Sequence, residues 1–375
     1  MQKNDAHETD RKKLDQIISN TTEYDSSKIP SSLIKDINKW KWGSYGWISP
    51  VSLIITAAWR KYLYPLIDCC KIWARDSEKK PILGGYSIRT EDEKVTIPLM
   101  AKYDLCTEFC SPNSGMQGSR AIEKMRSEKR LNKNFNSTQA TVFDLKLFAV
   151  ILNEINKLKP EQALEVFKML ILKACERKQH RIDLNQKLQN TEATGKNFNL
   201  PDFLSKTSDP ELTKCVVAAC FDVLFENSDL TLTGVEDYKT AADARAKKPG
   251  DIALCMDEIT IIAVEVKDKT QEIDWNNIDR AKNIMSNCPE LVDFIYVLEK
   301  RSATVTKTIK EIVESKKFKQ APYNKISFMS VHDLLLLANS VSGPDEVVTR
   351  TGKYLSLAPA IKTETKEKWV NLMND

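Results

Sequence analysis

The chain has 375 residues, 42% of them hydrophobic and 29% charged, which is enough for two packed domains rather than one. Its net charge of +4 is small, so overall charge excludes no class of partner and only local clusters of charge are informative. The longest mainly apolar runs, such as 51–59, are too short to span a membrane. The first thirteen residues are polar throughout, which indicates that no signal peptide is present. We therefore expect a soluble protein with no membrane partner.

The nine cysteines lie mostly inside apolar segments. Without a signal peptide, this pattern predicts free, buried thiols in a reducing cytosol. Cys106 and Cys110, with Cys69 and Cys70, could suggest a zinc site. The CxxC pairs and histidine partners of such a site are missing, since the chain has only three histidines. Buried thiols are therefore favoured over structural zinc.

The first two hundred residues are predicted to be mainly helical. The segment 49–76 begins with Ser-Pro and carries apolar residues on more than one face, as a well-buried helix does. The segment 84–99 contains two short strand-like runs around an acidic turn. The Gly, Ser and Asn content of 111–135 predicts a loop followed by a basic helix. The segment 141–188 then predicts a helical hairpin that is broken at Pro160.

The order of elements changes after the polar, aperiodic segment 189–210, which is predicted to be a linker or a mobile segment. The next helix begins with Asp209 as its N-cap and Pro210 at its first helical position. A hairpin, a helix, a strand, a helix, a strand and a helix follow, at 251–267, 274–287, 291–299, 305–316, 325–331 and 332–340. This order predicts an α+β fold, with an α/β core on a mixed β-sheet and a mainly α-helical N-terminal region.

The hairpin can be paired in two registers, and its hydrophobic pattern chooses between them. A three-residue loop, Asp257–Ile259, makes one face almost wholly apolar and sets Asp251 opposite Glu265. Lys267 then projects from the same face as Glu265. The other opposed pairs are Ile252 and Val264, Ala253 and Ala263, Leu254 and Ile262, Cys255 and Ile261, and Met256 and Thr260. A shift by one residue would move Asp251 to the other face, so the register that builds the better core also builds an acidic pair.

The polar end of the hairpin has the residue types of a phosphodiester-cleaving site. Two adjacent carboxylates repel each other unless a cation lies between them, and oxygen ligands of this kind suit Mg²⁺. A metal-bound water loses its proton more easily, and a lysine beside it can orient the water or stabilise developing charge. The alternative is a solvated Glu–Lys pair at a strand edge. The strongly apolar strand before Glu265 and the glycine before Asp251 favour the catalytic interpretation.

At these residues the chain resembles the PD-(D/E)xK nuclease superfamily. The match is Pro249-Gly250-Asp251 followed by Glu265-Val266-Lys267, with the proline one residue further from the aspartate than in the motif's name. Within that superfamily the chain looks most like the SacI-type restriction endonucleases. The likeness covers roughly residues 60–340 by local patterns, which occur in the family's order: GGYSIRTEDEKVTIPL, CVVAACFDVLF, GDIALCMDEITIIAVEVKDK and VHDLL.

The resemblance implies a role for each residue of the motif. Asp251, Glu265 and the Val266 carbonyl would bind Mg²⁺, and Lys267 would be the catalytic lysine. Such enzymes often recruit another acid from the helix before the hairpin, for which the candidates are Asp222 and Glu226. The alternative for both acids is that they only cap or decorate that helix. The resemblance also implies a homodimer that cuts a palindromic site in double-stranded DNA, without a nucleotide cofactor.

Contacts to DNA are expected from two basic clusters. The segment 239–249 carries four cations and one acid directly before Asp251, where phosphates must pass; its cations are Lys239, Arg245, Lys247 and Lys248. The segment 120–133 carries six cations and two acids, and it could equally be a solvated helix face. Side chains with bidentate reach that could read bases are Asn113, Gln117, Arg120 and Arg89. Arg89 could instead hold the helical region together through ion pairs.

These features together predict a Mg²⁺-dependent type II restriction endonuclease in the cytoplasm of a prokaryotic cell. We expect a mainly helical region at 1–200 for DNA recognition or dimerisation, a nuclease core at 201–345 and a C-terminal tail or helix at 346–375. One rival is a repair or modification-dependent nuclease of the same superfamily. The other is a DNA-binding module that keeps the fold without catalysis, against which the intact Asp, Glu and Lys argue.

Overall fold

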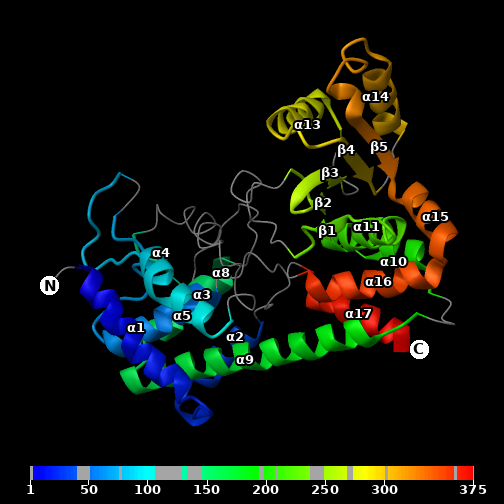
Figure 1. Ribbon diagram of the computed structural model, residues 1–375. Helices are drawn as coiled ribbons and strands as arrows, with labels where there is room; N and C mark the ends of the chain where they lie inside the picture. The colour runs from blue at the N-terminus through cyan, green and yellow to red at the C-terminus, as the bar shows by residue number, and fades with distance from the viewer. Residues whose placement is uncertain are drawn as a thin grey trace. The chain divides into compact units, whose positions relative to one another are not determined.

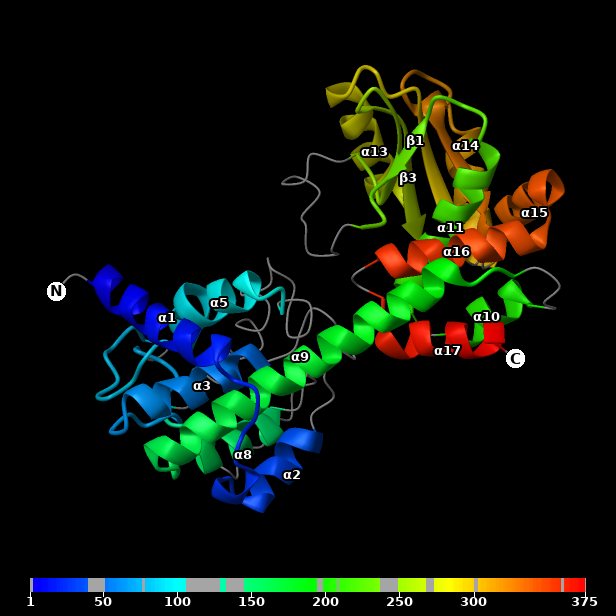
Figure 2. The same cartoon turned by 60° about the horizontal axis from the view of Figure 1, so that its bottom comes forward.

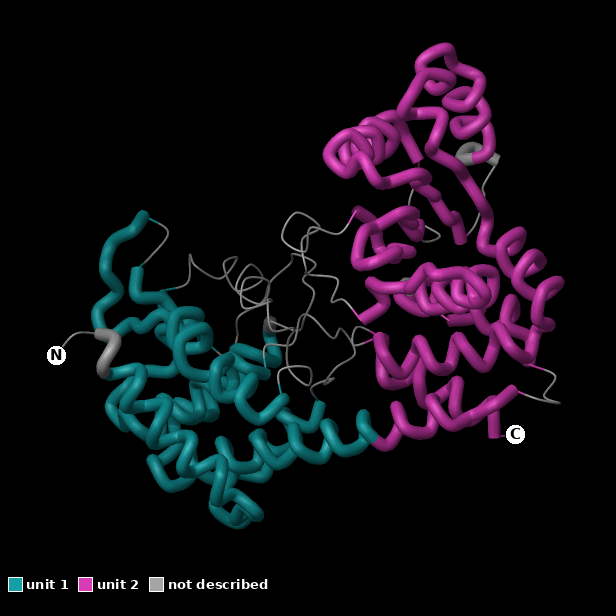
Figure 3. Tube along the Cα trace, in the orientation of Figure 1, with its two compact units in different colours: residues 1–182 teal, residues 183–375 magenta. Residues whose placement is uncertain are grey.

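The computed structural model describes eleven stretches of the chain: 3–39, 51–75, 78–105, 129–132, 145–193, 198–207, 209–236, 249–267, 273–299, 303–358 and 361–374. The chain divides into two compact units, Met1–Ile182 and Asp183–Asp375 (Figure 3). The division falls inside one long helix, α9 (Pro160–Asn190).

Unit 1 is built from helices in its described part (Figure 1). They are α1 (Lys3–Ser19), the 3₁₀ turn η1 (Ser26–Lys28), α2 (Ser31–Lys39), α3 (Val51–Leu63), α4 (Ile88–Glu91), the π-helical turn η2 (Asp92–Thr96), α5 (Ile97–Lys102), α8 (Leu145–Asn156) and the first part of α9. Helix α3 lies at the centre, since every residue from Val51 to Trp59 is buried. It packs against α8, α4 and η2. The predicted helical hairpin with its break before Pro160 is confirmed by α8 and α9.

Two expectations for unit 1 were wrong. Helix α3 ends at Leu63 instead of continuing to residue 76, because Pro65 disfavours helical backbone at the residue before it. The segment 84–99 is helical from residue 88 onward rather than strand-like. Its buried positions are Ile88, Asp92, Val95, Thr96 and Leu99, which is a helical spacing. Two of these buried residues are polar, and this concealed the periodicity.

Unit 2 contains a five-stranded mixed sheet in the order β1-β2-β3-β4-β5. The strands are β1 (Thr231–Thr233), β2 (Ile252–Met256), β3 (Ile259–Lys267), β4 (Asp293–Leu298) and β5 (Ile326–Ser330). The first three pair antiparallel, whereas β3, β4 and β5 run parallel. The helices are α10 (Leu200–Lys206), α11 (Pro210–Leu224), α13 (Trp275–Asn287), α14 (Ala303–Glu314), α15 (Val331–Ser342), α16 (Pro344–Leu357) and α17 (Thr363–Asn374), with a 3₁₀ turn η3 (Tyr323–Lys325). The predicted α+β fold is confirmed.

Helices cover both faces of this sheet (Figures 1 and 2). On one face Ile252, Leu254 and Val264 share a core with α11 and α15. On the other face Ala263 and Tyr296 share a core with α13 and α14. Because successive residues of a strand point to opposite faces, Glu265 and Lys267 lie on the α13 face with Ala263.

Helix α11 is the support against which much of unit 2 packs. It begins as predicted, with the Asp209 side chain accepting the N–H of Glu211 and with Pro210 in the first turn. Asp209 also accepts bonds from the backbone of Lys362 and the hydroxyl of Thr365, which connect the helix start to the C-terminal segment. Helices α15 and α16 pack along α11, so the helices that follow the sheet complete the core of this unit.

Two further observations concern the described residues only. None of their helices is long and apolar enough to cross a membrane. Their cysteines, Cys69, Cys70, Cys175, Cys215, Cys220, Cys255 and Cys288, are all free thiols.

Candidate active site

The hairpin formed by β2 and β3 has the predicted register at the end that carries the acidic pair. Ile252 lies opposite Val264, and the next two pairs toward the turn are also as predicted. The turn itself differs, because it contains only Asp257 and Glu258, both with positive φ. The prediction of a three-residue loop was therefore wrong. A bulge at Ile261 takes up the extra residue, so the shift does not reach the polar end of the hairpin.

Asp251 is held where the backbone approaches β3 closely. A Cβ added at Gly250 would lie 2.7 Å from the carbonyl oxygen of Val264, so only glycine fits there without movement. The Oδ2 atom of Asp251 accepts the N–H of Val266 at 2.8 Å. The Oδ1 atom accepts no hydrogen bond from any residue that the structure describes. One carboxylate oxygen is therefore available to a ligand.

Glu265 and Lys267 form a buried ion pair at the C-terminal end of β3. The Lys267 Nζ lies 2.9 Å from the Oε1 of Glu265, and the two residues are only 8% and 9% exposed. The Lys267 ammonium also lies over the Tyr296 ring, 5.9 Å from its centre. Strands β3 and β4 are parallel, and the carboxyl ends of parallel strands are the usual place for ligands in α/β sheets.

The pKa of Asp251 indicates that its carboxylate and that of Glu265 lie close together in a largely buried position. Burial raises the pKa of Asp251 to about 6, and the negative charge of Glu265 is the second cause. The hydrogen bond from Val266 and the ammonium of Lys214 act in the opposite direction and lower this pKa. A cation between the two carboxylates would relieve their repulsion.

The donor set fits a hard divalent cation such as Mg²⁺. Asp251 and Glu265 offer carboxylate oxygens, and Val266, the residue after Glu265, offers a main-chain carbonyl. In the part of the chain that the structure describes, no group of three or more His, Cys, Asp or Glu side chains is arranged to hold a metal ion. Two carboxylates with a carbonyl suit Mg²⁺, because this ion commonly retains several waters and binds few protein ligands.

The first turns of α11 bring two more charged residues toward Asp251, and the sequence analysis did not identify them. Glu211 and Lys214 are each 8% exposed, and the charges of both shift the pKa of Asp251. The Lys214 Nζ donates to the carbonyl of Gly234 at 2.7 Å. The N-cap predicted at Asp209 fixes where α11 begins, but nothing in the sequence shows that this end of the helix lies near Gly234 and Asp251.

Asp222 and Glu226, the predicted additional acids, lie further along the same segment. Asp222 is eleven residues after Glu211, which corresponds to roughly 16 Å along a helix. Both acids form ion pairs with Arg350 of α16, at 3.2 and 2.6 Å. Neither is among the groups that shift the pKa of Asp251. The structure therefore places them at α16 and does not bring them to the acidic pair.

Arg280 of α13 is a further cation near the pair that the sequence analysis did not identify. Its Nη1 atom lies 3.8 Å from the Oε1 of Glu265, and its side chain is 47% exposed. Arg280 lies five residues after Trp275, the first residue of α13, and therefore belongs to the second turn of this helix. No motif in the sequence marks it.

Most of the predicted DNA contacts cannot be placed. Asn113, Gln117, Arg120, Lys239, Arg245, Lys247 and Lys248 lie outside the described residues. Arg89 is described and belongs to α4, where its Nε donates to Glu93 at 2.7 Å in an i,i+4 ion pair. This contact is local to one helical stretch and does not decide between a DNA contact and ion pairs that hold the helical region together.

Comparison with known families gives a match that covers the site. Residues 196–285 match the family model of the SacI restriction endonuclease C-terminal domain. This range contains Asp251, Glu265 and Lys267 together with α11 and most of α13. A search of curated proteins found no match to the chain. The family match confirms the resemblance predicted from the sequence, and this part of the chain is similar to the C-terminal domain of a SacI-type restriction endonuclease.

Proposed function

We propose that the protein is a type II restriction endonuclease that hydrolyses phosphodiester bonds in double-stranded DNA with Mg²⁺ as cofactor. The observation that carries the proposal is the hairpin end at which Asp251, Glu265 and Lys267 meet, inside the segment that matches the family model. Two repelling carboxylates next to a lysine have no evident structural benefit at a strand end, whereas metal-assisted hydrolysis needs such a set.

Asp251, Glu265 and the Val266 carbonyl would hold the Mg²⁺, which when bound supplies an acidified water and neutralises charge on the phosphate. Glu265 would exchange part of its contact with Lys267 for this role. The ammonium of Lys267 would then donate hydrogen bonds to the attacking water or to a non-bridging phosphate oxygen. Asp251 keeps its orientation through the Val266 N–H.

Two residues from the neighbouring helices would complete the site. Glu211 supports the role of the additional acid better than Asp222 or Glu226 does, because its charge raises the pKa of Asp251, whereas Asp222 and Glu226 lie against Arg350 of α16. Arg280 would bind a phosphate oxygen, since its guanidinium approaches Glu265 and yet remains about half exposed.

The partners follow from the same proposal. The substrate is duplex DNA, the enzyme acts as a homodimer on a palindromic site, and it works in the cytoplasm of a prokaryotic cell. The basic segment 239–249 contacts the DNA backbone without reading sequence.

A plasmid digest with purified protein tests the function. We expect discrete fragments in Mg²⁺ and none in EDTA, and sequencing of the fragment ends should give one short palindrome. The Asp251→Ala variant, assayed at the same concentration, should cut nothing. Fragments with random ends would favour a repair nuclease of the same fold instead. Cutting by Asp251→Ala would refute the assigned site.

A further inference from the structure

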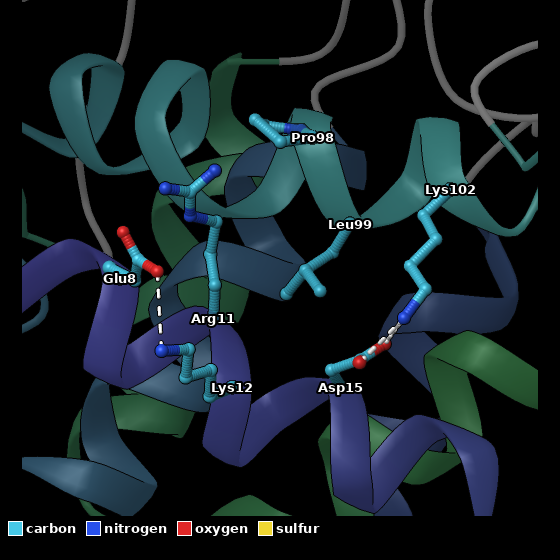
Figure 4. A pocket seen from close by; sticks show the side chains of 7 residues that line it. All are labelled: Glu8, Arg11, Lys12, Asp15, Pro98, Leu99 and Lys102. Carbon is cyan, nitrogen blue, oxygen red and sulfur yellow. Dashed lines mark hydrogen bonds and ion pairs between the residues drawn. The ribbon is translucent and has the colours of Figure 1, made fainter.

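Unit 1 contains a pocket of about 250 Å³ between α1 and α5 (Figure 4). The wall formed by α1 consists of four charged residues at an i, i+3, i+4, i+7 spacing: Glu8, Arg11, Lys12 and Asp15. The wall formed by α5 consists of Lys102 and the apolar pair Pro98 and Leu99. The pocket thus combines five charged side chains with a small apolar surface.

Both acids of the pocket already have cationic partners. Glu8 pairs with Lys12 at 3.2 Å, and Asp15 pairs with Lys102 at 2.6 Å. The Tyr103 hydroxyl donates a further hydrogen bond to Asp15 at 2.7 Å. The hydrogen bond from Lys102 is the main cause that lowers the pKa of Asp15, so this carboxylate stays charged and engaged.

Arg11 lies between these two ion pairs and has no acidic partner among the residues that the structure describes. Figure 4 shows its side chain reaching from α1 toward Pro98. Its Nε atom is buried and makes no hydrogen bond with any residue that the structure describes. A buried N–H without an acceptor is unfavourable, so a shift of the Arg11 side chain that brings this N–H to a ligand oxygen would be favoured. The three cations and two acids of the pocket leave a charge of +1.

We propose that this pocket binds one phosphate group of the DNA backbone, outside the nuclease unit. A phosphodiester carries a single negative charge, which would neutralise the excess charge of the pocket. The guanidinium of Arg11 presents several donors in a fixed plane and suits phosphate oxygens. Pro98 and Leu99 would contact the adjoining sugar. This inference rests on the proposed function, because DNA is the source of the phosphate.

The first experiment measures binding of a duplex of unrelated sequence by anisotropy at several salt concentrations, with Ca²⁺ in place of Mg²⁺. The Arg11→Gln variant should bind more weakly than wild type, and the slope of log affinity against log salt should fall by about one unit. Lys13→Gln removes the same charge from an exposed position of α1 and should leave the slope unchanged. Arg11→Lys keeps the charge and should restore most of the slope. Equal slopes for Arg11→Gln and Lys13→Gln would overturn the proposal.

The second experiment uses inorganic phosphate alone as the probe. Phosphate, compared with chloride at equal ionic strength, should raise the thermal unfolding midpoint of wild type and of Lys13→Gln more than that of Arg11→Gln. If this difference appears while the DNA slope of Arg11→Gln is normal, the pocket takes free phosphate and its assignment to DNA is wrong. If phosphate stabilises all three proteins equally, no phosphate site exists at Arg11.

The two experiments also separate this inference from the proposed function. A wild-type protein that neither binds nor cuts DNA would refute the nuclease assignment and, with it, the DNA assignment of the pocket. The phosphate measurement would still report whether an anion binds at Arg11. Normal cutting by wild type with an unchanged salt slope in Arg11→Gln would refute the pocket alone.

Discussion

Glu265 is the residue on which the charges of the site converge. Lys267 and Arg280 both approach its Oε1 atom, at 2.9 and 3.8 Å. Asp251 is oriented by the neighbouring Val266 and repelled by the Glu265 charge. A divalent cation bound by Glu265 would compete with these two cations for the charge of the carboxylate, which would favour their release toward the substrate. The residue-scale predictions follow from this exchange.

Replacing Lys267 should separate catalysis from binding. We expect Lys267→Ala and Lys267→Met to lower the cleavage rate by at least about a hundredfold, because an ammonium that acts on the reaction is lost. Affinity for a cognate duplex in Ca²⁺ should change little. The Met variant keeps an unbranched side chain that can still lie over Tyr296, so it controls for packing. Loss of both binding and folding in the two variants would show that Lys267 has a structural role.

Arg280→Gln should affect substrate binding more than turnover. If the guanidinium binds a phosphate beside the scissile bond, KM should rise by about tenfold while kcat falls less. Arg280→Lys keeps the charge without the planar fork and should lie between wild type and Arg280→Gln. The measurement is steady-state cleavage of a short cognate duplex. A fall in kcat at constant KM would place Arg280 in the chemical step instead.

Metal affinity should depend on the protonation of Asp251. Its pKa is raised from 3.8 to about 6, so the carboxylate must lose a proton before it can bind a metal. The apparent affinity for Mn²⁺ should therefore be constant above about pH 7 and fall by up to tenfold per unit below about pH 6. Calorimetric titrations across this range would measure it. Asp222→Asn, which alters an acid held by Arg350, should keep the wild-type profile. An affinity that does not change between pH 5 and pH 7 would contradict this assignment.

At the scale of elements, the hairpin shows how far a hydrophobic pattern can be used. The pattern decided the faces of Asp251, Glu265 and Lys267 correctly, because a slip there would have exposed a buried face. It could not decide the turn. Tight turns with two positive φ values usually carry Asn-Gly or Asp-Gly, whereas this turn is Asp257-Glu258. The bulge at Ile261 then restores the predicted pairing of the two strands, and no residue in the sequence predicts this bulge.

The helical segment of unit 1 near residue 92 was not recognised because its buried side includes a carboxylate. Asp92 is 3% exposed and accepts hydrogen bonds from Ser52 and Thr56 of α3, at 3.3 and 3.2 Å. Thr56 also shares a bond with Thr96, which in turn accepts the indole N–H of Trp59. Such a network satisfies buried polar groups only after the helices have packed. A single sequence does not contain that information.

The Asp92 network should make the stability of the protein depend on pH. Burial raises the pKa of Asp92 from 3.8 to about 7, against the lowering effect of the hydroxyl hydrogen bonds. The folded state therefore binds more protons than the unfolded state between these values. The contribution of Asp92 to the free energy of unfolding should fall as pH rises through this window, by up to about 1.4 kcal/mol per pH unit. Above the window this contribution should be constant.

Asp92→Asn should remove this contribution. The free energy of unfolding of the variant in urea, minus that of wild type, should therefore increase as pH rises from about 4 to about 7. The matched control is Asp104→Asn, an exposed carboxylate of the same unit, which should keep the wild-type slope. A constant difference between wild type and Asp92→Asn at all pH values would mean that this carboxyl has an ordinary pKa.

At the scale of the whole molecule, the sequence predicted unit 2 better than unit 1. In unit 2, strand order, capping at Asp209 and the site hairpin act locally and agree with one another. In unit 1, the position of each helix depends on contacts that are distant along the chain, such as the bond from the Asp25 N–H to Glu165. The net charge of the whole chain also says little about its partners, since +4 is the difference between 56 cationic and 52 acidic residues.

Under the proposed function, affinity for DNA would therefore come from local clusters such as the lysines before Asp251. Lys247 and Lys248 lie outside the described residues, and their expected role rests on their place in the sequence. Replacing both by Ala should weaken binding to cognate and random duplexes by similar factors, because phosphate contacts carry no sequence information. The slope of log affinity against log salt should fall by about two units, one for each lost contact.

The matched control replaces Lys307 and Lys310, exposed residues of α14, and makes the same change in net charge. Anisotropy at several salt concentrations measures both effects. An equal slope in the two double variants would mean that net charge alone acts, whereas weakening at the cognate site only would show that these lysines read bases.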